Sequence, residues 1–170
     1  MPAVERARPF QEYMQEYKRQ MEKGDIREAY RGLMVYIMAL RSHFADKYPA
    51  YSVPGNIYYG YMDMTYFSIV PESFKSRKLK VAIVFLHDSC RFEVWLAGSN
   101  RQVQAQYWKS FRESGWNKYR MPAMGKGVDS IVEHTLAENP DFGDLESLTG
   151  QIEAKTLRFI EDIEDFLSKQ

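Results

Sequence analysis

Two short apolar runs with a polar turn between them constrain the fold of this chain more than any other feature. The first run, LKVAIVFLH, covers residues 79–87 and is too short and too rich in β-branched residues to favour a helix. The second run, RFEVWLA, covers residues 91–97 and alternates apolar residues with charged and aromatic ones. Asp88, Ser89 and Cys90 separate the two runs. The pattern predicts a β-hairpin whose first strand lies in the middle of a sheet.

Two further strands are expected around this hairpin. Residues 57–70 are dense in β-branched and aromatic side chains and stop at Pro71. Residues 128–136 form a half-polar fourth candidate, for which a helix is the alternative. Between the third and fourth strands a helix is expected over residues 100–114, with its start at Ser99.

Amphipathic helices are expected at both ends of the chain. Residues 1–48 contain apolar residues at helical spacing on both sides of Gly24, which predicts a helical pair. Residues 144–168 predict a C-terminal helix with Gly150 as a possible break. The chain is thus expected to be a single α/β domain over residues 1–170, in α+β order. Its sheet region, with an inserted helix, spans residues 57–136 and is four-stranded, mainly antiparallel and flanked by helices.

The cysteine content and hydropathy indicate the compartment. Cys90 is the one cysteine, so neither an intramolecular disulfide nor a cysteine zinc cluster is possible. The first ten residues, MPAVERARPF, lack the apolar stretch of a secretory signal, and no run approaches the roughly 18 apolar residues of a membrane span. We therefore expect a cytoplasmic protein without membrane contact.

Charge is unevenly spread although the formal net charge is zero. Residues 71–126 carry 11 Lys and Arg against 4 Asp and Glu, whereas residues 129–170 carry 3 against 11. The basic middle is consistent with a phosphate or nucleic-acid surface, and equally with packing of the two segments against each other. The structural interpretation is favoured.

The order of elements resembles the core of the restriction-endonuclease-like fold, which PD-(D/E)xK nucleases share. That resemblance implies two carboxylates that hold a divalent metal and a lysine that steadies the attacking water. Asp88 and Glu93 stand at about the positions of the carboxylates, but Trp95 replaces the lysine. Lys80 or Lys109 substitutes for it only if the fold brings one close. This resemblance implies at most a metal-dependent phosphodiesterase or nuclease with a degenerate active site.

The phrases YGYMDMTYF and RFEVWLAGSNRQVQAQYWKSFRESGWNKY are similar to those of a small family of uncharacterised bacterial proteins of about this length. The likeness covers most of the chain. It implies one domain and a bacterial cytosolic location, and it implies no activity.

The histidines and the cysteine give few chemical candidates. His43, His87 and His134 form no HxH, HxxxH or HxxE pattern, so no metal site is predicted. His87, beside Asp88 at a strand end, is a candidate general base, although such histidines are more often hydrogen-bonded at the rim of a core. Cys90 in the same turn is a candidate nucleophile, but sequence neighbours rarely have triad geometry.

A better candidate site is the strand-to-helix turn after the hairpin. Ser99 and Arg101 stand where helix N-terminal amides and a guanidinium attract an anion. Strand alternation places Arg91, Glu93 and Trp95 on one face beside them. If that face is open, Arg91, Trp95, Ser99 and Arg101 make a binding site for a small anionic ligand. If helices cover it, the turn is only a capped helix start and the charges pair with each other.

Aromatic residues on the first expected strand suggest a further alternative. The tyrosines at positions 58, 59, 61 and 66, together with Phe67, have the side chains that stack on bases of single-stranded nucleic acid. Tyrosines over a sheet are more often part of the core. Nucleic acid therefore stays a weaker hypothesis than a small anion or a protein partner. The favoured function is a noncatalytic or cryptic binding module without a cofactor.

Overall fold

A computed structural model describes residues 7–170 as an α+β protein with one four-stranded antiparallel sheet and five helices. Residues 1–6, which begin the segment examined for a secretory signal, lie outside the described part. The elements follow the order α1 (Phe10–Lys23), α2 (Asp25–Lys47), β1 (Met64–Ile69), α3 (Glu72–Lys75), β2 (Leu79–Leu86), β3 (Arg91–Gly98), α4 (Arg101–Glu113), β4 (Val132–Ala137) and α5 (Leu145–Ser168). Within residues 7–170, no helix has the length and apolar character that crossing a bilayer requires.

Backbone contacts divide the chain into two units, one that ends at Ala39 and one over Leu40–Gln170. The predicted helical pair is present as α1 and α2, and the first unit holds α1 and the part of α2 up to Ala39. Gly24 adopts the left-handed conformation that ends α1. No residue of α1 is buried, and its apolar stripe of Phe10, Tyr13 and Tyr17 is exposed. The single domain over residues 1–170 stays a prediction.

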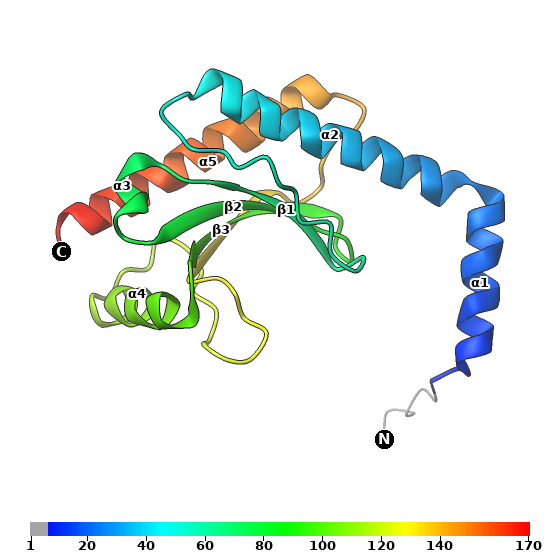
Figure 1. Ribbon diagram of the computed structural model, residues 1–170, viewed down its shortest axis with the longest axis horizontal. Coiled ribbons are helices and arrows are strands. Elements are labelled where there is room, and N and C mark those ends of the chain that lie inside the picture. The colour runs from blue at the N-terminus through cyan, green and yellow to red at the C-terminus, as the bar shows by residue number, and fades with distance from the viewer. Residues whose placement is uncertain (1–6) are drawn as a thin grey trace. The chain divides into compact units, whose positions relative to one another are not determined.

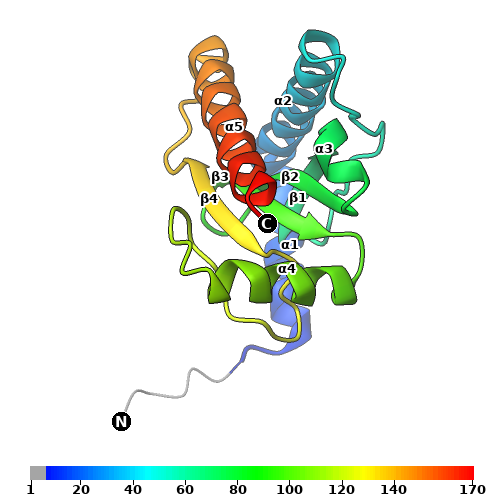
Figure 2. The ribbon, with the colours of Figure 1, turned by 90° about the vertical axis from the view of Figure 1, so that its left-hand side faces the viewer.

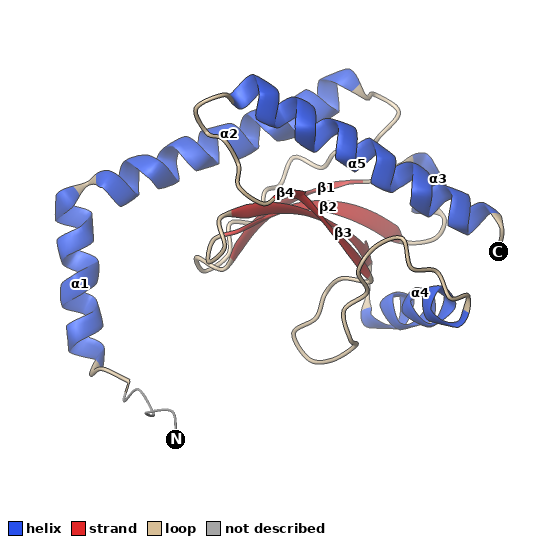
Figure 3. Ribbon diagram, turned by 180° about the vertical axis from the view of Figure 1, so that it is seen from behind, coloured by secondary structure: helices blue, strands red, loops and turns tan. Residues whose placement is uncertain are grey.

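The second unit is built on the hairpin that the two apolar runs predict. β2 pairs antiparallel with β1 on one side and with β3 on the other, and β4 pairs antiparallel with β3. Helices lie on both sides of the sheet: α5 packs on one face and α4 lies on the opposite side (Figures 1 and 2). The curved sheet turns its concave face toward α4 (Figure 3).

The sheet is a simple meander in the order β1-β2-β3-β4. The nuclease-like topology is therefore not confirmed: parallel pairing of the first and fourth strands would follow from it, but these strands lie at opposite edges. The hairpin pattern explains the antiparallel pairing of β2 with β3, because a tight turn joins these two strands.

Several boundaries differ from the sequence-based expectation. The fourth strand, expected over residues 128–136, spans Val132–Ala137. The first strand does not span residues 57–70 but begins at Met64, because Gly60 and Met62 adopt positive φ angles of 72° and 65° that break an extended chain. The polar stretch after Pro71 contains the short helix α3, which sequence pattern did not predict. Gly150 does not interrupt α5, which runs unbroken from Leu145 to Ser168.

The core lies between the sheet and α5. Ile83 and Phe85 on β2 are 2% and 3% exposed, as expected for a central strand with neighbours on both sides. Ile160 and Ile163 on α5 are equally buried, on the face where helical periodicity predicted apolar contact.

Two carboxylates of α5 are nearly buried and fully paired. Glu153 accepts hydrogen bonds from Tyr48, from His43 Nε2 at 2.8 Å and from Lys47 Nζ at 2.7 Å. Burial raises the pKa of Glu153, but the hydrogen bonds from Lys47, Tyr48 and His43 outweigh it and hold the pKa at about 2. These contacts tie the last turns of α2, residues 40–47, to α5.

Asp162 makes the corresponding link to the loop before β4. It accepts hydrogen bonds from Tyr119 Oη at 2.5 Å and from Lys118 Nζ at 3.1 Å. Burial alone would raise the pKa of Asp162, and the hydrogen bonds from Tyr119 and Lys118 lower it instead. Lys118 belongs to the basic middle segment and Asp162 to the acidic tail. The uneven charge distribution is thus partly neutralised within the fold.

Candidate functional site

A pocket of about 400 Å³ opens where β1, β2 and β3 meet the start of α4. This volume is within the range of small-molecule sites in proteins. Its lining consists of Tyr58, Met64, Tyr66, Lys80, Ala82, Trp95, Ala97, Gly98, Ser99, Asn100, Arg101, Gln104 and Asp129.

The floor of the pocket consists of small residues. Ala82 on β2 and Ala97 on β3 leave room above the sheet, where larger side chains would fill it. Gly98 allows the close approach of β3 to α4, because a Cβ atom there would stand 2.8 Å from the backbone nitrogen of Gln104. The sequence thus places residues with small side chains, or none, where β3 leads into α4.

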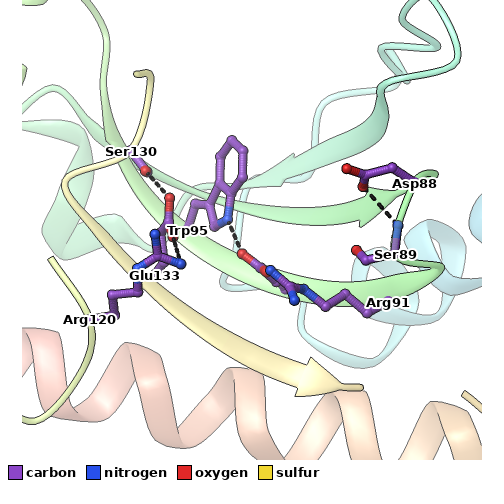
Figure 4. Close-up of polar contacts among 8 residues, drawn as sticks. Asp88, Ser89, Arg91, Trp95, Arg120, Ser130 and Glu133 are labelled. Atoms are coloured by element: carbon purple, nitrogen blue, oxygen red, sulfur yellow. Dashed lines mark hydrogen bonds and ion pairs between the residues drawn. The ribbon is translucent and has the colours of Figure 1, made fainter. Parts of the chain in front are cut away.

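Aromatic rings stand on two sides of this floor. Tyr66 on β1 stacks on Tyr58, with ring centroids 5.0 Å apart and an interplanar angle of 28°. Trp95 stands on β3, and its indole points away from α5 (Figure 4). The aromatic sides add apolar surface to a lining that also contains polar and charged side chains.

Glu93 holds the Trp95 ring in place. The Glu93 side chain is 4% exposed and accepts hydrogen bonds from Trp95 Nε1 at 2.9 Å and from Arg91 Nε at 2.6 Å (Figure 4). A buried carboxylate needs such partners, because an unpaired buried charge costs several kcal/mol. The predicted open face is therefore divided: Trp95 lines the pocket, while Arg91 and Glu93 pair as expected for a covered surface.

Two cations and one carboxylate belong to the pocket lining. Lys80 Nζ lies 5.8 Å from the centroid of the Tyr66 ring, and no carboxylate of residues 7–170 lies within 4.0 Å of it. Arg101 donates to the Val128 carbonyl oxygen at 2.9 Å and lies 3.8 Å from Asp129. The lining carries a net positive charge, with Lys80 as its unpaired cation.

The N-terminus of α4 adds a favourable electrostatic field for an anion. Asn100, not the expected Ser99, caps this helix, and its side chain accepts a hydrogen bond from the Val103 backbone nitrogen at 2.9 Å. Ser99 precedes the cap and lines the pocket. Both short polar residues suit the non-helical backbone before a helix, which is why sequence pattern alone did not separate them.

The fold brings together three of the four residues predicted to bind a ligand, namely Trp95, Ser99 and Arg101. Arg91 stands outside the lining and pairs with Glu93. These positions describe the geometry; ligand binding by these residues stays a prediction.

Of the candidate catalytic residues, His87, Asp88 and Cys90 lie at the hairpin turn, outside this pocket lining, and Glu93 lies on β3. The Asp88 carboxylate accepts a hydrogen bond from the Ser89 backbone nitrogen at 2.7 Å and so stabilises the turn (Figure 4). His87 Nε2 lies 2.9 Å from Thr65 Oγ1, and burial lowers the pKa of this histidine. Cys90 is exposed, with Sγ 3.4 Å from the His87 carbonyl oxygen.

The metal site that the nuclease resemblance implies has little to support it. Within residues 7–170, no group of three or more His, Cys, Asp and Glu residues is arranged to hold a metal ion. The Glu93 carboxylate accepts hydrogen bonds from Arg91 and Trp95, while the Asp88 carboxylate accepts one from the turn backbone. Lys109, offered as a replacement for the missing lysine, lies 3.8 Å from Glu113 on α4, and Lys80 belongs to the pocket.

Sequence reasoning did not assign Lys80, Gln104 or Asp129 to the ligand site. A signal for Lys80 was present: the register of the hairpin pairs Lys80 with Ala97 and Ala82 with Trp95, which places all four on one face. Gln104 donates to the Val128 carbonyl oxygen at 2.8 Å, and Asp129 adjoins that residue. Asp129 lies on the loop between α4 and β4, and only the folded path of that loop brings it to the pocket.

The model of a family described as "Domain of unknown function (DUF7000)" matches residues 10–167. The chain belongs to this DUF7000 family. The match confirms the expected relation to a family of uncharacterised proteins, and it includes every pocket residue of this DUF7000 domain. No curated protein and no solved structure matches the chain.

Proposed function

We propose that this DUF7000 domain is a binding module that holds a small anionic ligand in the pocket between the concave face of the sheet and the start of α4. The observation that carries the proposal is Lys80, a cation that lines the pocket without a carboxylate within 4.0 Å among residues 7–170. Three ion pairs neutralise other cations of the basic middle segment against the acidic tail, at Arg101, Lys118 and Arg120. Lys80 remains available to a ligand.

Two further features support an anion rather than a neutral ligand. The N-terminus of α4 lies at the pocket, and the helix dipole there favours negative charge. Arg101 pairs with Asp129 only at 3.8 Å and with both side chains 59% exposed, so a bound anion competes easily for the guanidinium.

We also propose the bacterial cytosol as its location, in line with the single cysteine and the resemblance of the quoted sequence phrases. A protein partner is the other class of ligand that the sequence suggested. The pocket favours the small molecule, because its volume suits one compact ligand.

The experiment is a titration of the isotope-labelled full chain with inorganic phosphate, followed by amide and indole chemical shifts. The expected shifts concentrate at residues 98–104, at Lys80 and at the Trp95 indole N–H. Sodium chloride at matched ionic strength is the control, since it screens charge without a specific fit. Shifts confined to surface lysines elsewhere, or equal shifts with chloride, would contradict the proposal.

A further inference from the structure

The sheet places an aromatic ring on each side of a small residue. Tyr66 stands on β1, Trp95 on β3, and Ala82 on β2 between them, and all three line the pocket. Ala82 pairs with Trp95 on β3 and with Ser68 on β1. Tyr66 pairs with Val84, the next residue of β2 on the same face, so the two rings stand diagonally across Ala82. A larger side chain at position 82 would occupy the space between the two rings.

The strand spacing provides room for a third ring. Strands β1 and β3 are separated by two strand spacings, or roughly 9–10 Å, and Tyr66 is offset from Trp95 by two residues, or roughly 7 Å along the strand. A flat ring between two others needs roughly 3.5 Å on each side, or about 7 Å in total. The pocket therefore has space between its aromatic sides for one planar group.

Both rings are held before any ligand arrives. Tyr66 stacks on Tyr58, while the Trp95 N–H is bound to the buried Glu93 carboxylate. Rings fixed in this way lose little side-chain entropy when a ligand stacks on them. The indole N–H has its acceptor within the protein, so the Trp95 ring offers its apolar surface to the ligand.

The cationic side chains lie next to the space between Tyr66 and Trp95, which we call the aromatic slot. Lys80 Nζ is 5.8 Å from the Tyr66 ring centroid, and Ser99 and Arg101 line the same pocket. From these positions we infer that the anionic group is attached to a planar aromatic ring, which stacks between Tyr66 and Trp95 while Lys80 and Arg101 bind the anion. This inference rests on the proposed function and specifies its ligand class. Phosphates of nucleosides and carboxylates of aromatic acids share this chemistry.

The test is calorimetric titration of the full chain with ligands that differ only in the ring. Adenosine monophosphate is compared with ribose 5-phosphate, and indole-3-acetate with acetate. Stacking on an aromatic side chain contributes roughly 1–3 kcal/mol. The ring-bearing member of at least one pair should thus bind about 5-fold to 150-fold more tightly. The pair with the larger ratio distinguishes a phosphate from a carboxylate ligand.

Two variants locate the effect in the slot. Trp95→Ala removes one ring, and Ala82→Leu fills the slot while both rings stay; each should bring the affinity ratio close to one. Tyr61→Ala, at an aromatic residue that is 93% exposed and outside the lining, should leave the ratio unchanged. Thermal melting of each variant verifies that it is folded.

The outcomes separate this inference from the proposed function. Equal affinities within both pairs, with phosphate still bound, overturn the aromatic ligand and leave the anion site. A ratio that persists in both slot variants also overturns it. If no anionic probe binds, or adenosine binds as tightly as its monophosphate, the proposed function itself fails.

Discussion

The indole Nε1 of Trp95 donates a 2.9 Å hydrogen bond to Glu93, a carboxylate whose side chain is 4% exposed. Through this bond a buried charge orients the ring at the side of the pocket. A side-chain hydrogen bond between two residues of β3 thus helps to set the shape of the candidate site.

Glu93→Gln should lower the free energy of unfolding by roughly 1.5–3 kcal/mol, because the hydrogen bonds from Arg91 and Trp95 lose their charged acceptor. Urea unfolding at neutral pH measures the change. Glu113→Gln is the matched control, since Glu113 is 67% exposed and lies 3.8 Å from Lys109. Equal stability of the two variants would show that the Glu93 contacts contribute little.

Phe85→Ala should cost roughly 3–5 kcal/mol, because it removes a 3% exposed ring from the central strand and leaves a cavity. The same substitution at Phe10, which is 78% exposed, provides the comparison and should have little effect. A Phe85→Ala protein that melts within a degree or two of the wild type would be inconsistent with a central β2.

Gly98→Ala should destabilise the fold by roughly 1–3 kcal/mol, since the new Cβ atom would stand 2.8 Å from the Gln104 backbone nitrogen. Gly150→Ala on α5 meets no atom within 4 Å and should stabilise by roughly 0.4–1 kcal/mol. Chemical denaturation of both variants tests the opposite signs. The close approach of β3 to α4 is wrong if Gly98→Ala is also stabilising.

Acid should remove the contribution of Glu153. Its folded-state pKa of about 2 lies below the ordinary value of 4.5, so the stabilisation is present above about pH 4.5 and is lost as pH falls toward 2. Glu153→Gln should therefore be less stable than the wild type by roughly 1–3 kcal/mol at about pH 5.5, and the difference should shrink at about pH 3. A difference that is constant over this range would contradict the assigned pairing with Lys47 and Tyr48.

The sequence predicted the elements better than their ends. The hairpin pattern was decisive because apolar alternation and a polar turn agree over residues 79–97. The tyrosine-rich stretch before Met64 has the composition of a strand, yet Gly60 and Met62 require positive φ angles that composition does not reveal. Local pattern therefore overestimated the first strand.

The site was predictable only where neighbours in sequence remain neighbours in space. Trp95, Ser99 and Arg101 follow one another from β3 into α4, and the pocket contains all three. Asp129 arrives through a loop, and its approach to Arg101 depends on tertiary packing. Arg91 was assigned to the same site by alternation, but its position farther from α4 along β3 and its bond to Glu93 keep it out of the lining.

The most direct test of an anion site is the dissociation constant of inorganic phosphate, measured by calorimetry at one fixed ionic strength for three variants. Lys80→Ala removes the unpaired cation of the lining and should weaken binding about 5-fold or more, whereas Asp129→Asn removes its carboxylate and should strengthen binding about 2-fold to 5-fold. Lys169→Ala, which removes an exposed lysine outside the lining, should leave the constant unchanged. If all three variants bind phosphate alike, the pocket is not the anion site and the account of this domain as an anion-binding module is contradicted.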